Sequence, residues 1–562
     1  MKRLRWQIAI VAVALVAIAL VIYGKQPVIQ TLSSAPSAGG VYTEALIGSP
    51  VRFNPLLDYY NQPDRDVDRL LYSSLMTYDS WGNPIPELAE KMGVSVNGEV
   101  YNILLRENAV WHDGEPVTSA DVIFTVELMR DESIPLPEDI RSLWNSVEVI
   151  AFDEFNLQFQ LSEPYAPFVD YLGFGILPEH LLEGKTGEAL INSAFNLEPV
   201  GSGPFQFEEL LIEDGVVVGV VLSAFNEYYI EKPFIDQIVF RYYDSSSDAF
   251  QAYIDGEVLG IGLVDRAVLQ DVLDEPGLNV YSSRYPQMCI LLLNLGNDSV
   301  PFFQEVNVRK ALIAGLNRLR MVDQVLDGQA IIANSPIFPG SWAYYDNVDP
   351  FEYNKNEAIR LLQETGYVIP AEGGKVRKKE GLALSFDLVH LGDEEHALLA
   401  NMIKEDLDGI GISVNLIEVN RSELVETYLD PRSYDAALVD WSLNRTPDPD
   451  PYPFWHQSQT TGGQNYSMWN DRRASEYLEN ARVTFNHQER VRLYKNFQVH
   501  FNHELPAIPL FYPIYTYAVS ESIAGVSIGP LYDPSDRFSN VLEWYLIALP
   551  ETREEEPIET PQ

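Results

Sequence analysis

The sequence has few of the residues and motifs on which common catalytic and metal sites are built. One cysteine, Cys289, stands among 562 residues, so an intrachain disulfide and metal sites of the CxxC kind are excluded. HExxH, GxxxxGKS and GxxxxGKT are absent, which removes the usual signatures of zinc proteases and P-loop proteins. His500 and His503 lie three apart on a predicted helix, a spacing more typical of an interfacial helix surface than of a metal site. The sequence therefore predicts no cofactor and no catalysis.

Basic residues are also scarce, with 38 Lys and Arg against 82 Asp and Glu and a formal net charge of −44. Such a charge repels phosphate backbones and anionic membrane surfaces, so nucleic acid is excluded as a partner. Carboxylate pairs are unavoidable in a chain this acidic and do not by themselves indicate a glycosidase. An exported polysaccharide-degrading enzyme nevertheless stays open as an alternative.

The only long hydrophobic run lies at the N-terminus. Three basic residues within Met1 to Arg5 precede eighteen uncharged residues from Trp6 to Tyr23, the pattern of a signal sequence or membrane anchor. No small-x-small cleavage site follows directly, and no cysteine is present to accept a lipid. We predict an uncleaved anchor over 1–24 that holds the rest outside the cytoplasm, then a flexible linker over 25–40.

The remaining chain mixes strand-like and helix-like segments, which predicts an α/β protein. With 46% hydrophobic residues, 562 residues suffice for two large lobes. Alternating or β-branched runs predict strands at 101–106, 155–161, 215–225, 235–243, 384–391 and 412–419, and apolar spacings of three and four predict helices at 308–326, 354–366, 394–411 and 487–504. Strand, helix and strand between 384 and 419 form one crossover unit, which predicts a mainly parallel sheet in the second lobe. Residues 551–562 are acidic and predict a disordered tail.

The stretch VWHDGEPVTSADVIFT, residues 110–125, poses the question of whether His112 and Asp113 perform chemistry. Asp113 and Gly114 form a turn dipeptide, and Thr118 stands three residues before Asp121, the spacing of a capping box at a helix start. Because each polar residue has a local backbone role, we predict a structural role for His112 and Asp113.

This stretch also carries a family resemblance. YNILLRENAVWHDGEPVTSADVIFTVELM resembles the signature of family 5 solute-binding proteins, which serve ABC importers of oligopeptides, dipeptides and nickel. Further blocks follow in that family's order: GSPVRFNPLLD, GSGPFQF, NEYYIEKPFID, NVRKALIAGLNR, YNKNEAIRLLQETGY, YDAALVDW and ELPAIPLF. The resemblance implies a two-lobed, periplasmic-binding-protein-like α/β fold of type II with an extra subdomain, in which a ligand cleft lies between the lobes. It also implies lobe I over 41–285 plus 505–550, with the subdomain at about 86–200, and lobe II over 290–500.

The segment YDAALVDWSLNRTPDPDPYPFWHQ, from Tyr434, resembles the loop that floors the family's pocket. In peptide-binding members an aspartate three residues beyond the tryptophan equivalent to Trp441 pairs with the peptide's ammonium group, and here that position is Asn444. An amide cannot offset a buried positive charge, so a peptide N-terminus needs another partner. Asp440, Asp448 or Asp450 could take that role. Otherwise, neutral oligosaccharides become a competing ligand class.

The other predicted ligand-binding residues also rest on the resemblance. Gly48, Ser49 and Arg52 belong to the GSPVRFNP block that borders the cleft in the dipeptide-binding branch, and Arg52 could meet a carboxylate bidentately. Tyr59 follows on the same segment, and Tyr466 lies in GGQNYSMW, which resembles the family's next loop.

The predicted function is an extracytoplasmic, monomeric solute-binding protein. It binds peptides or another small polar oligomer and delivers them to the transmembrane subunits of an ABC permease. The alternatives are an oligosaccharide receptor of the same fold and a sensory or chaperone-like binding domain that works without a permease.

Overall fold

The computed structural model describes residues 38–79, 81–442 and 446–547, and all helices and strands given below belong to this part of the chain. The predicted anchor at 1–24, most of the linker at 25–40 and the tail at 551–562 lie outside the described residues.

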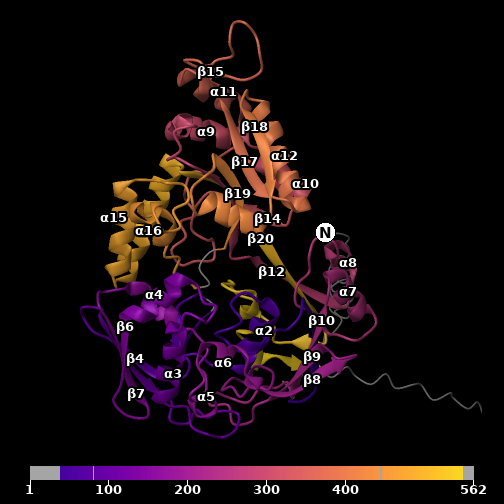
Figure 1. Ribbon diagram of the computed structural model, residues 1–562. Helices are drawn as coiled ribbons and strands as arrows, with labels where there is room; N and C mark the ends of the chain where they lie inside the picture. Colours follow the sequence, from indigo (N-terminus) through magenta and orange to yellow (C-terminus); the bar gives the residue numbers. More distant parts are fainter. Residues whose placement is uncertain (1–37, 80, 443–445, 548–562) are drawn as a thin grey trace, which may run out of the picture. The chain divides into compact units, whose positions relative to one another are not determined.

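A twelve-stranded mixed sheet runs through the described chain (Figure 1). Its main order is β18 (Ser413–Val419), β17 (Ser385–Leu391), β19 (Ala436–Ser442), β13 (Gln287–Leu293), β20 (Ala507–Ser520), β11 (Gly260–Ile261), β1 (Val41–Ile47), β10 (Gln237–Tyr243), β9 (Val216–Ala224) and β8 (Phe205–Glu213). Two further strands, β12 (Leu278–Arg284) and β14 (Ala330–Ile332), also pair with β20.

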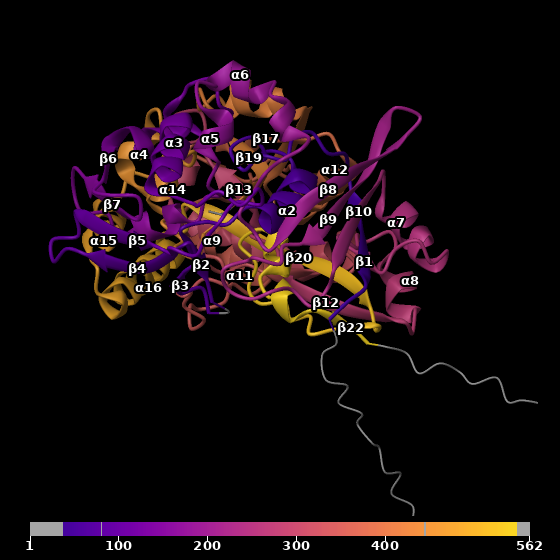
Figure 2. The same cartoon turned by 90° about the horizontal axis from the view of Figure 1, so that it is seen from below.

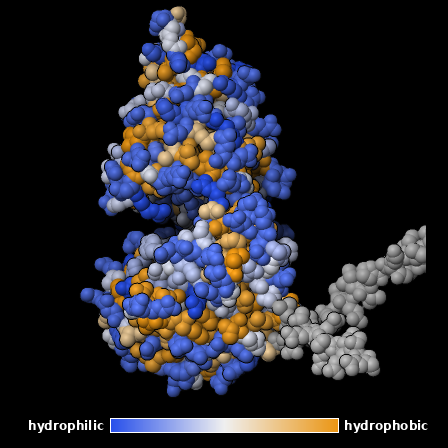
Figure 3. Space-filling model, turned by 90° about the vertical axis from the view of Figure 1, so that its right-hand side faces the viewer, coloured by the Kyte–Doolittle hydropathy of each residue, from blue (hydrophilic) through white to orange (hydrophobic). Residues whose placement is uncertain are grey.

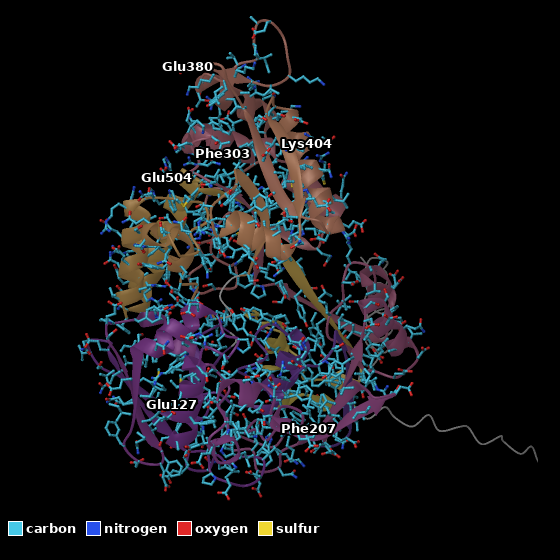
Figure 4. All side chains as sticks on the ribbon, in the orientation of Figure 1. Glu127, Phe207, Phe303, Glu380, Lys404 and Glu504 are labelled. Atoms are coloured by element: carbon cyan, nitrogen blue, oxygen red, sulfur yellow. The ribbon has the colours of Figure 1, made fainter. Side chains whose placement is uncertain are left out.

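The hydrophobic core divides into two sets of clusters along the chain. Two clusters contain only residues between Tyr42 and Tyr285 or between Tyr515 and Leu546, and we call this part lobe I. The other two contain only residues between Met288 and Tyr512, and we call this part lobe II. Figure 4 shows the side chains of both, with Phe207 in lobe I and Phe303 in lobe II.

Strand β20 belongs to both lobes. Its first half pairs with β13 between Ala507 and Phe511, and its second half pairs with β12 between Ile514 and Ser520. The chain passes between the lobes twice, once before β13 and once within β20, and the Tyr285 amide donates to the Pro513 carbonyl oxygen at 2.9 Å where the two passages meet. The lobes are therefore connected by two adjacent, hydrogen-bonded segments.

Lobe I contains a second sheet as well as its share of the large one. This sheet is antiparallel, in the order β4 (Ala89–Val94), β5 (Val100–Leu105), β7 (Asn156–Leu161) and β6 (Val147–Ala151). Helices α3 (Ser119–Arg130) and α4 (Glu138–Ser146) pack beside it. Figure 2 shows α7 (Ser246–Ile254) and α8 (Leu269–Asp274) beside β1, β10 and β12 at the other side of the lobe. The strands predicted at 101–106, 155–161, 215–225 and 235–243 are all confirmed.

His112 and Asp113 have the predicted structural role. The Gly201 amide donates to His112 Nδ1 and the ring's Nε2 donates to Gly203 O, both at 3.1 Å. Burial lowers the pKa of His112 to about 4, so the ring is neutral. The Thr118 amide donates to Asp121 Oδ2 at 2.8 Å, which completes the capping box.

Lobe II is built around the predicted crossover unit. Strands β17 and β18 pair in parallel, and α12 (Glu394–Asp408) packs on both. The expectation of a mainly parallel sheet is wrong, however, because β19 pairs antiparallel with β13, and β13 pairs antiparallel with β20. Strand β13 leads from lobe I into lobe II, whereas β20 leads back to lobe I, so the two strands run in opposite directions.

The helix predicted at 308–326 is two helices, α9 (Val306–Gly315) and α10 (Arg318–Val325). Asn317 caps α10 by accepting the Arg320 amide at 3.1 Å, and its own amide donates to Asp406 Oδ2 at 2.8 Å. A polar cap inside an apolar pattern thus ends one helix and starts the next. The other three helix predictions are confirmed by α11 (Lys355–Glu364), α12 and α16 (His487–Glu504).

The remaining elements are short or lie at the lobe borders. Helices are α2 (Gln62–Leu71), α5 (Glu179–Leu182), α6 (Gly187–Ile191), α13 (Arg421–Glu423), α14 (Tyr452–Trp455) and α15 (Arg472–Val483). Two-stranded pairs are β2 (Met76–Tyr78) with β3 (Pro84–Pro86), β15 (Lys378–Lys379) with β16 (Leu382–Ala383), and β21 (Ile523–Ala524) with β22 (Tyr545–Leu546). Short 3₁₀ segments include η1 (Ala166–Leu172) and η6 (Pro534–Phe538).

Candidate functional site

A recess separates lobe I from lobe II on the face shown in Figure 3. At its border the segment after β19 reaches lobe I through polar contacts. The Asp448 amide donates to Asp170 Oδ2 at 2.7 Å, and the Tyr165 hydroxyl donates to Asp450 Oδ2 at 2.9 Å. Both lobes therefore contribute groups to this border.

A cavity of about 540 Å³, which we call the interlobe cavity, is bounded by both lobes. It is lined by Asp139, Ser142, Leu143, Ser146, Leu161, Ser162, Glu163, Pro164, Tyr165 and Tyr171 of lobe I and by Tyr452, Pro453, Gln459, Glu479, Arg482 and Val483 of lobe II. Phenolic rings and charged groups are both among the lining side chains, a composition that suits small polar molecules. A cavity of about 600 Å³ also exists but is bounded by lobe II alone, so its occupant would not bridge the lobes.

Arg482 organises the lobe II wall of the interlobe cavity. Its Nη2 lies 2.6 Å from Asp450 Oδ2, and its guanidinium carbon lies 3.8 Å from the centre of the Tyr452 ring. Although burial opposes the charge, Asp450 raises the pKa of Arg482 above its ordinary value. The other face of Tyr452 stacks on His456 with ring centres 4.0 Å apart. The ring is thus held between a cation and an imidazole.

Asp448 is engaged inside lobe II and does not present a free carboxylate. Its side chain forms an ion pair with Arg490, and the Tyr494 hydroxyl donates to its Oδ1 at 3.3 Å. Asp448 is 3% exposed, and burial raises its pKa while Arg490 opposes that shift. The predicted ligand-binding role of Asp448 would therefore need its ion pair to open.

Trp441 lies at the end of β19, where the sequence places the pocket floor. Its half-buried ring packs edge-on against Phe454, with centres 4.5 Å apart, and lies 5.0 Å from Trp455. Asn444, the predicted substitute for the ammonium anchor, lies outside the described residues.

Asp440, the residue before Trp441, already faces a cation. His396 Nε2 lies 3.4 Å from Asp440 Oδ2, and His396 Nδ1 lies 2.8 Å from Asp393 Oδ2. Burial disfavours the charged imidazole, but Asp440 and Asp393 outweigh burial and raise the pKa of His396 to about 9. The imidazolium is therefore the form that Asp440 meets at neutral pH.

The predicted rim residues lie together on the loop between β1 and α2. Gly48 adopts a φ of 115°, which favours glycine, and the Ser49 carbonyl oxygen accepts the Asn61 side-chain amide at 3.0 Å. Arg52 Nε donates to the Ile191 carbonyl oxygen at 2.9 Å. The Arg52 side chain is thus tied to lobe I itself.

Tyr59 and Tyr466 lie on different lobes. Tyr59 meets Tyr60 edge-on, with ring centres 4.9 Å apart, on the segment before α2. The Tyr466 hydroxyl donates to Asp430 Oδ1 at 3.3 Å, and the Arg432 guanidinium lies 4.5 Å from its ring centre. The structure therefore groups Gly48, Ser49, Arg52 and Tyr59 around the start of α2 and leaves Tyr466 in a separate cluster of lobe II.

A further cavity, of about 220 Å³, lies in lobe I, and we call it the α2 pocket. It is lined by Pro55, Asp58, Arg65, Asp68, Arg69, Tyr72, Ser74, Met76, Thr77, Tyr78, Gly173, Phe174, Gly175, Asp533, Ser535 and Asp536. One of these lining residues, Tyr78, donates from its hydroxyl to the Asp170 carbonyl oxygen at 2.9 Å. The side chain of the same Asp170 accepts the Asp448 amide. The α2 pocket therefore lies beside the border between the lobes.

Sequence reasoning did not nominate Tyr165, Arg482 or Asp68. Tyr165 and Arg482 belong to elements far from each other in the sequence, and only the folded chain brings them to one cavity. Within the described residues, no group of three or more His, Cys, Asp and Glu is arranged to hold a metal ion.

The sequence model of bacterial extracellular solute-binding proteins, family 5 (middle region), matches residues 83–464. The oligopeptide-binding protein AppA of Bacillus subtilis (strain 168) is 28% identical over 530 residues, covering 91% of this chain and 92% of that protein. The dipeptide-binding protein of Escherichia coli (strain K12) is 24% identical over 517 residues, covering 86% of this chain and 91% of that protein.

Solved structures are similar over the same extent. Bacillus subtilis AppA in complex with a nonapeptide aligns with a TM-score of 0.70 and 27% identity, covering 91% of this chain and 100% of that chain. NikZ from Campylobacter jejuni in complex with Ni(L-His) aligns with a TM-score of 0.69 and 25% identity, covering 90% of this chain and 99% of that chain.

Proposed function

Because the chain belongs to the bacterial extracellular solute-binding proteins of family 5, we propose that it is the receptor subunit of an ABC importer that binds peptides or related small polar oligomers. The observation that carries this proposal is the interlobe cavity, to which both lobes contribute side chains. Similar proteins named for oligopeptide and dipeptide binding support the ligand class.

Binding works through closure of the lobes. A ligand that touches only one lobe has the same affinity for open and closed forms and shifts nothing. A ligand in the interlobe cavity contacts both, so it favours the closed form. The two hydrogen-bonded passages at Tyr285 and Pro513 are the natural hinge because, within the described residues, they carry the chain from lobe to lobe.

We assign the solute contacts as follows. Trp441 forms an apolar wall at the end of β19, Asn444 offers an amide in place of the carboxylate of peptide-binding members, and Gly48, Ser49 and Arg52 form a rim on lobe I. Trp441 and the three rim residues do not line the interlobe cavity itself, so they contact parts of the solute that extend beyond it. Tyr59, Asp448 and Tyr466 stay secondary candidates, since Asp448 is engaged by Arg490 and Tyr466 lies apart from the rim.

The cellular setting belongs to the same proposal. The protein acts outside the cytoplasm as a monomer, held to the membrane through residues 6–23, and presents its closed form to the transmembrane permease subunits. The proposal includes the bounds of lobe I, 41–285 plus 505–550, and of lobe II, 290–500. It also includes the absence of catalysis. Among helices of residues 38–79, 81–442 and 446–547, none is both long and apolar enough to span a bilayer.

Calorimetry with a library of di- to nonapeptides, and with neutral oligosaccharides, tests the proposal. We expect peptide binding that Trp441→Ala weakens about 10-fold, because the wall loses a large aromatic surface. Trp81→Ala is the matched control, since Trp81 is 76% exposed, and it should leave affinity unchanged. Binding of oligosaccharides alone would move the assignment to a sugar receptor, and equal affinities for wild type and Trp441→Ala would refute the pocket.

A further inference from the structure

Three aspartates on one helix, α2, have different environments. Asp64 accepts two backbone amides of the preceding loop at 2.8 and 2.9 Å. Asp66 pairs with Arg537, whose Nη1 lies 2.8 Å from its Oδ1. Asp68 is 3% exposed and forms no ion pair with a cationic side chain in the described part of the chain, and the groups that act on its carboxylate are the acids Asp58 and Asp64 and the Asn54 backbone amide. One buried carboxylate on this helix is therefore unmatched.

The unmatched carboxylate lines the α2 pocket, where four acids (Asp58, Asp68, Asp533 and Asp536) face two arginines (Arg65 and Arg69). Arg65 Nε already lies 2.9 Å from Asp533 Oδ2. Arg69 Nη2 donates to Thr77 Oγ1 at 3.3 Å, and the acids Glu87 and Asp536 stabilise its charge. Neither arginine neutralises Asp68.

An isolated buried carboxylate is expensive to ionise. Burial raises the pKa of Asp68 well above its ordinary value, and the neighbouring carboxylates of Asp58 and Asp64 raise it further. A cation entering the pocket would reverse this balance because it offsets the charge that the protein leaves alone.

The acids of lobe II near Trp441 differ in this respect. Asp440 faces His396, Asp448 faces Arg490 and Asp450 faces Arg482, so each already has a cationic partner. A positively charged group of a solute between the lobes therefore meets matched carboxylates on lobe II. On lobe I, Asp68 of the neighbouring α2 pocket has no cationic partner in the described residues.

We propose that the α2 pocket binds a primary ammonium group of the solute on the carboxylate of Asp68, with Asp58 beside it. Lobe I, through the last turn of α2, then holds the positive end of the ligand. The ammonium can come from a peptide's amino terminus or from a lysine side chain, which share one chemistry. This assignment rests on the proposed function for its ligand class.

Three probe peptides test the proposal by calorimetry: tetra-alanine, N-acetyl-tetra-alanine and N-acetyl-Ala-Lys-Ala-Ala. For Asp68→Asn we expect about 100-fold weaker binding of the peptide that carries the bound ammonium, since hydrogen bonds to charged groups are the strong ones. Loss for tetra-alanine identifies the amino terminus as the source, and loss for the lysine peptide identifies the side chain. N-acetyl-tetra-alanine should bind both proteins equally.

The matched control is Asp387→Asn, which removes an acid that lines the separate cavity of lobe II. It should bind all three peptides like wild type, and thermal unfolding should show both variants folded. Equal binding of every peptide by wild type and Asp68→Asn would overturn the ammonium site at Asp68. It would not contradict the proposed binding of peptides by the protein.

A second measurement needs no peptide. Butylammonium is titrated into protein labelled with ¹³C at aspartate carboxyl carbons, and the Asp68 signal is identified by its loss in Asp68→Asn. We expect a saturable shift of this signal with butylammonium and none with butyramide. Absence of the shift would overturn the ammonium site even if peptides bind, whereas a shift without any peptide binding would refute only the peptide ligand class.

Discussion

The α2 pocket of lobe I and the segment after β19 in lobe II are both crowded with aspartates, but only lobe II matches each with a cation. Asp448 and Asp450 have Arg490 and Arg482, and both carboxylates are nearly inaccessible. Asp68 is equally buried and has no such partner in the described residues.

This difference separates structural acids from an acid available for binding. A buried ion pair is satisfied within the protein, so breaking it to bind a ligand costs several kcal/mol. An unmatched buried acid instead lowers the stability of the protein without ligand. A cationic ligand that pairs with such an acid removes this electrostatic cost. Acidity alone therefore identifies no site, whereas the pairing of each carboxylate does.

The largest expected effect comes from removing a partner in lobe II. Arg490→Met leaves Asp448 buried and unpaired, and we expect the free energy of unfolding to fall by about 3–5 kcal/mol in urea titrations. Arg492→Met, on the same helix but exposed, is the control and should unfold like wild type. A small effect of Arg490→Met would mean that Asp448 is not an ion-paired structural acid.

The His396 pair should give a pH-dependent effect. The raised pKa of about 9 means that folding favours the protonated ring, so its stabilisation is complete below about pH 6.5 and lost as pH rises through about 9. We expect His396→Gln to lower the free energy of unfolding by about 2 kcal/mol at pH 6. Urea titrations at pH 6, 8 and 10 should show the difference shrinking, and a constant difference would contradict the pairing.

A smaller effect is expected for a contact between the lobes. Tyr165→Phe removes the hydroxyl that donates to Asp450 but leaves Arg482 in place. We expect a loss of about 1.5 kcal/mol, typical of a hydrogen bond to a charged acceptor, in thermal unfolding. Tyr60→Phe, at a ring that is 75% exposed, should change nothing. Equal behaviour of the two variants would exclude a contribution from this contact.

Asp68→Asn should have the smallest effect and the opposite sign. Because the folded pKa of Asp68 is raised, its wild-type contribution is full below about pH 4 and is lost as pH rises through the folded pKa. We expect the variant to be about 1 kcal/mol more stable at neutral pH and to lose this advantage in acid. A destabilised variant at pH 7 would show that Asp68 has a partner in the empty protein.

Much of the fold could be predicted because its signals are local. The apolar spacing of 487–504 gave the exact bounds of α16, and strand, helix and strand between 384 and 419 gave the parallel pair β17 and β18. The break at Asn317 and the antiparallel pairing of β13 were missed because both depend on distant partners, Asp406 and β20.

The binding site was harder to predict. Helix α2 carries five charged residues among its ten, a composition typical of an exposed helix, yet Asp64, Asp66 and Asp68 are all buried. The partner of buried Asp66 is Arg537, 471 residues later in the chain. The sequence resemblance nominated Trp441 and the rim at Gly48, but it gave no information on which acids already had partners.

The sharing of β20 between the lobes has a consequence for biosynthesis. During translation, β1, β10 and β11 leave the ribosome early, but the strand that connects β11 to the rest of the sheet is made only after all of lobe II. The edge of the sheet in lobe I therefore stays unpaired until residues 514–520 are synthesised. An N-terminal fragment that ends at Glu504 should aggregate when it is expressed alone, because that edge stays uncovered.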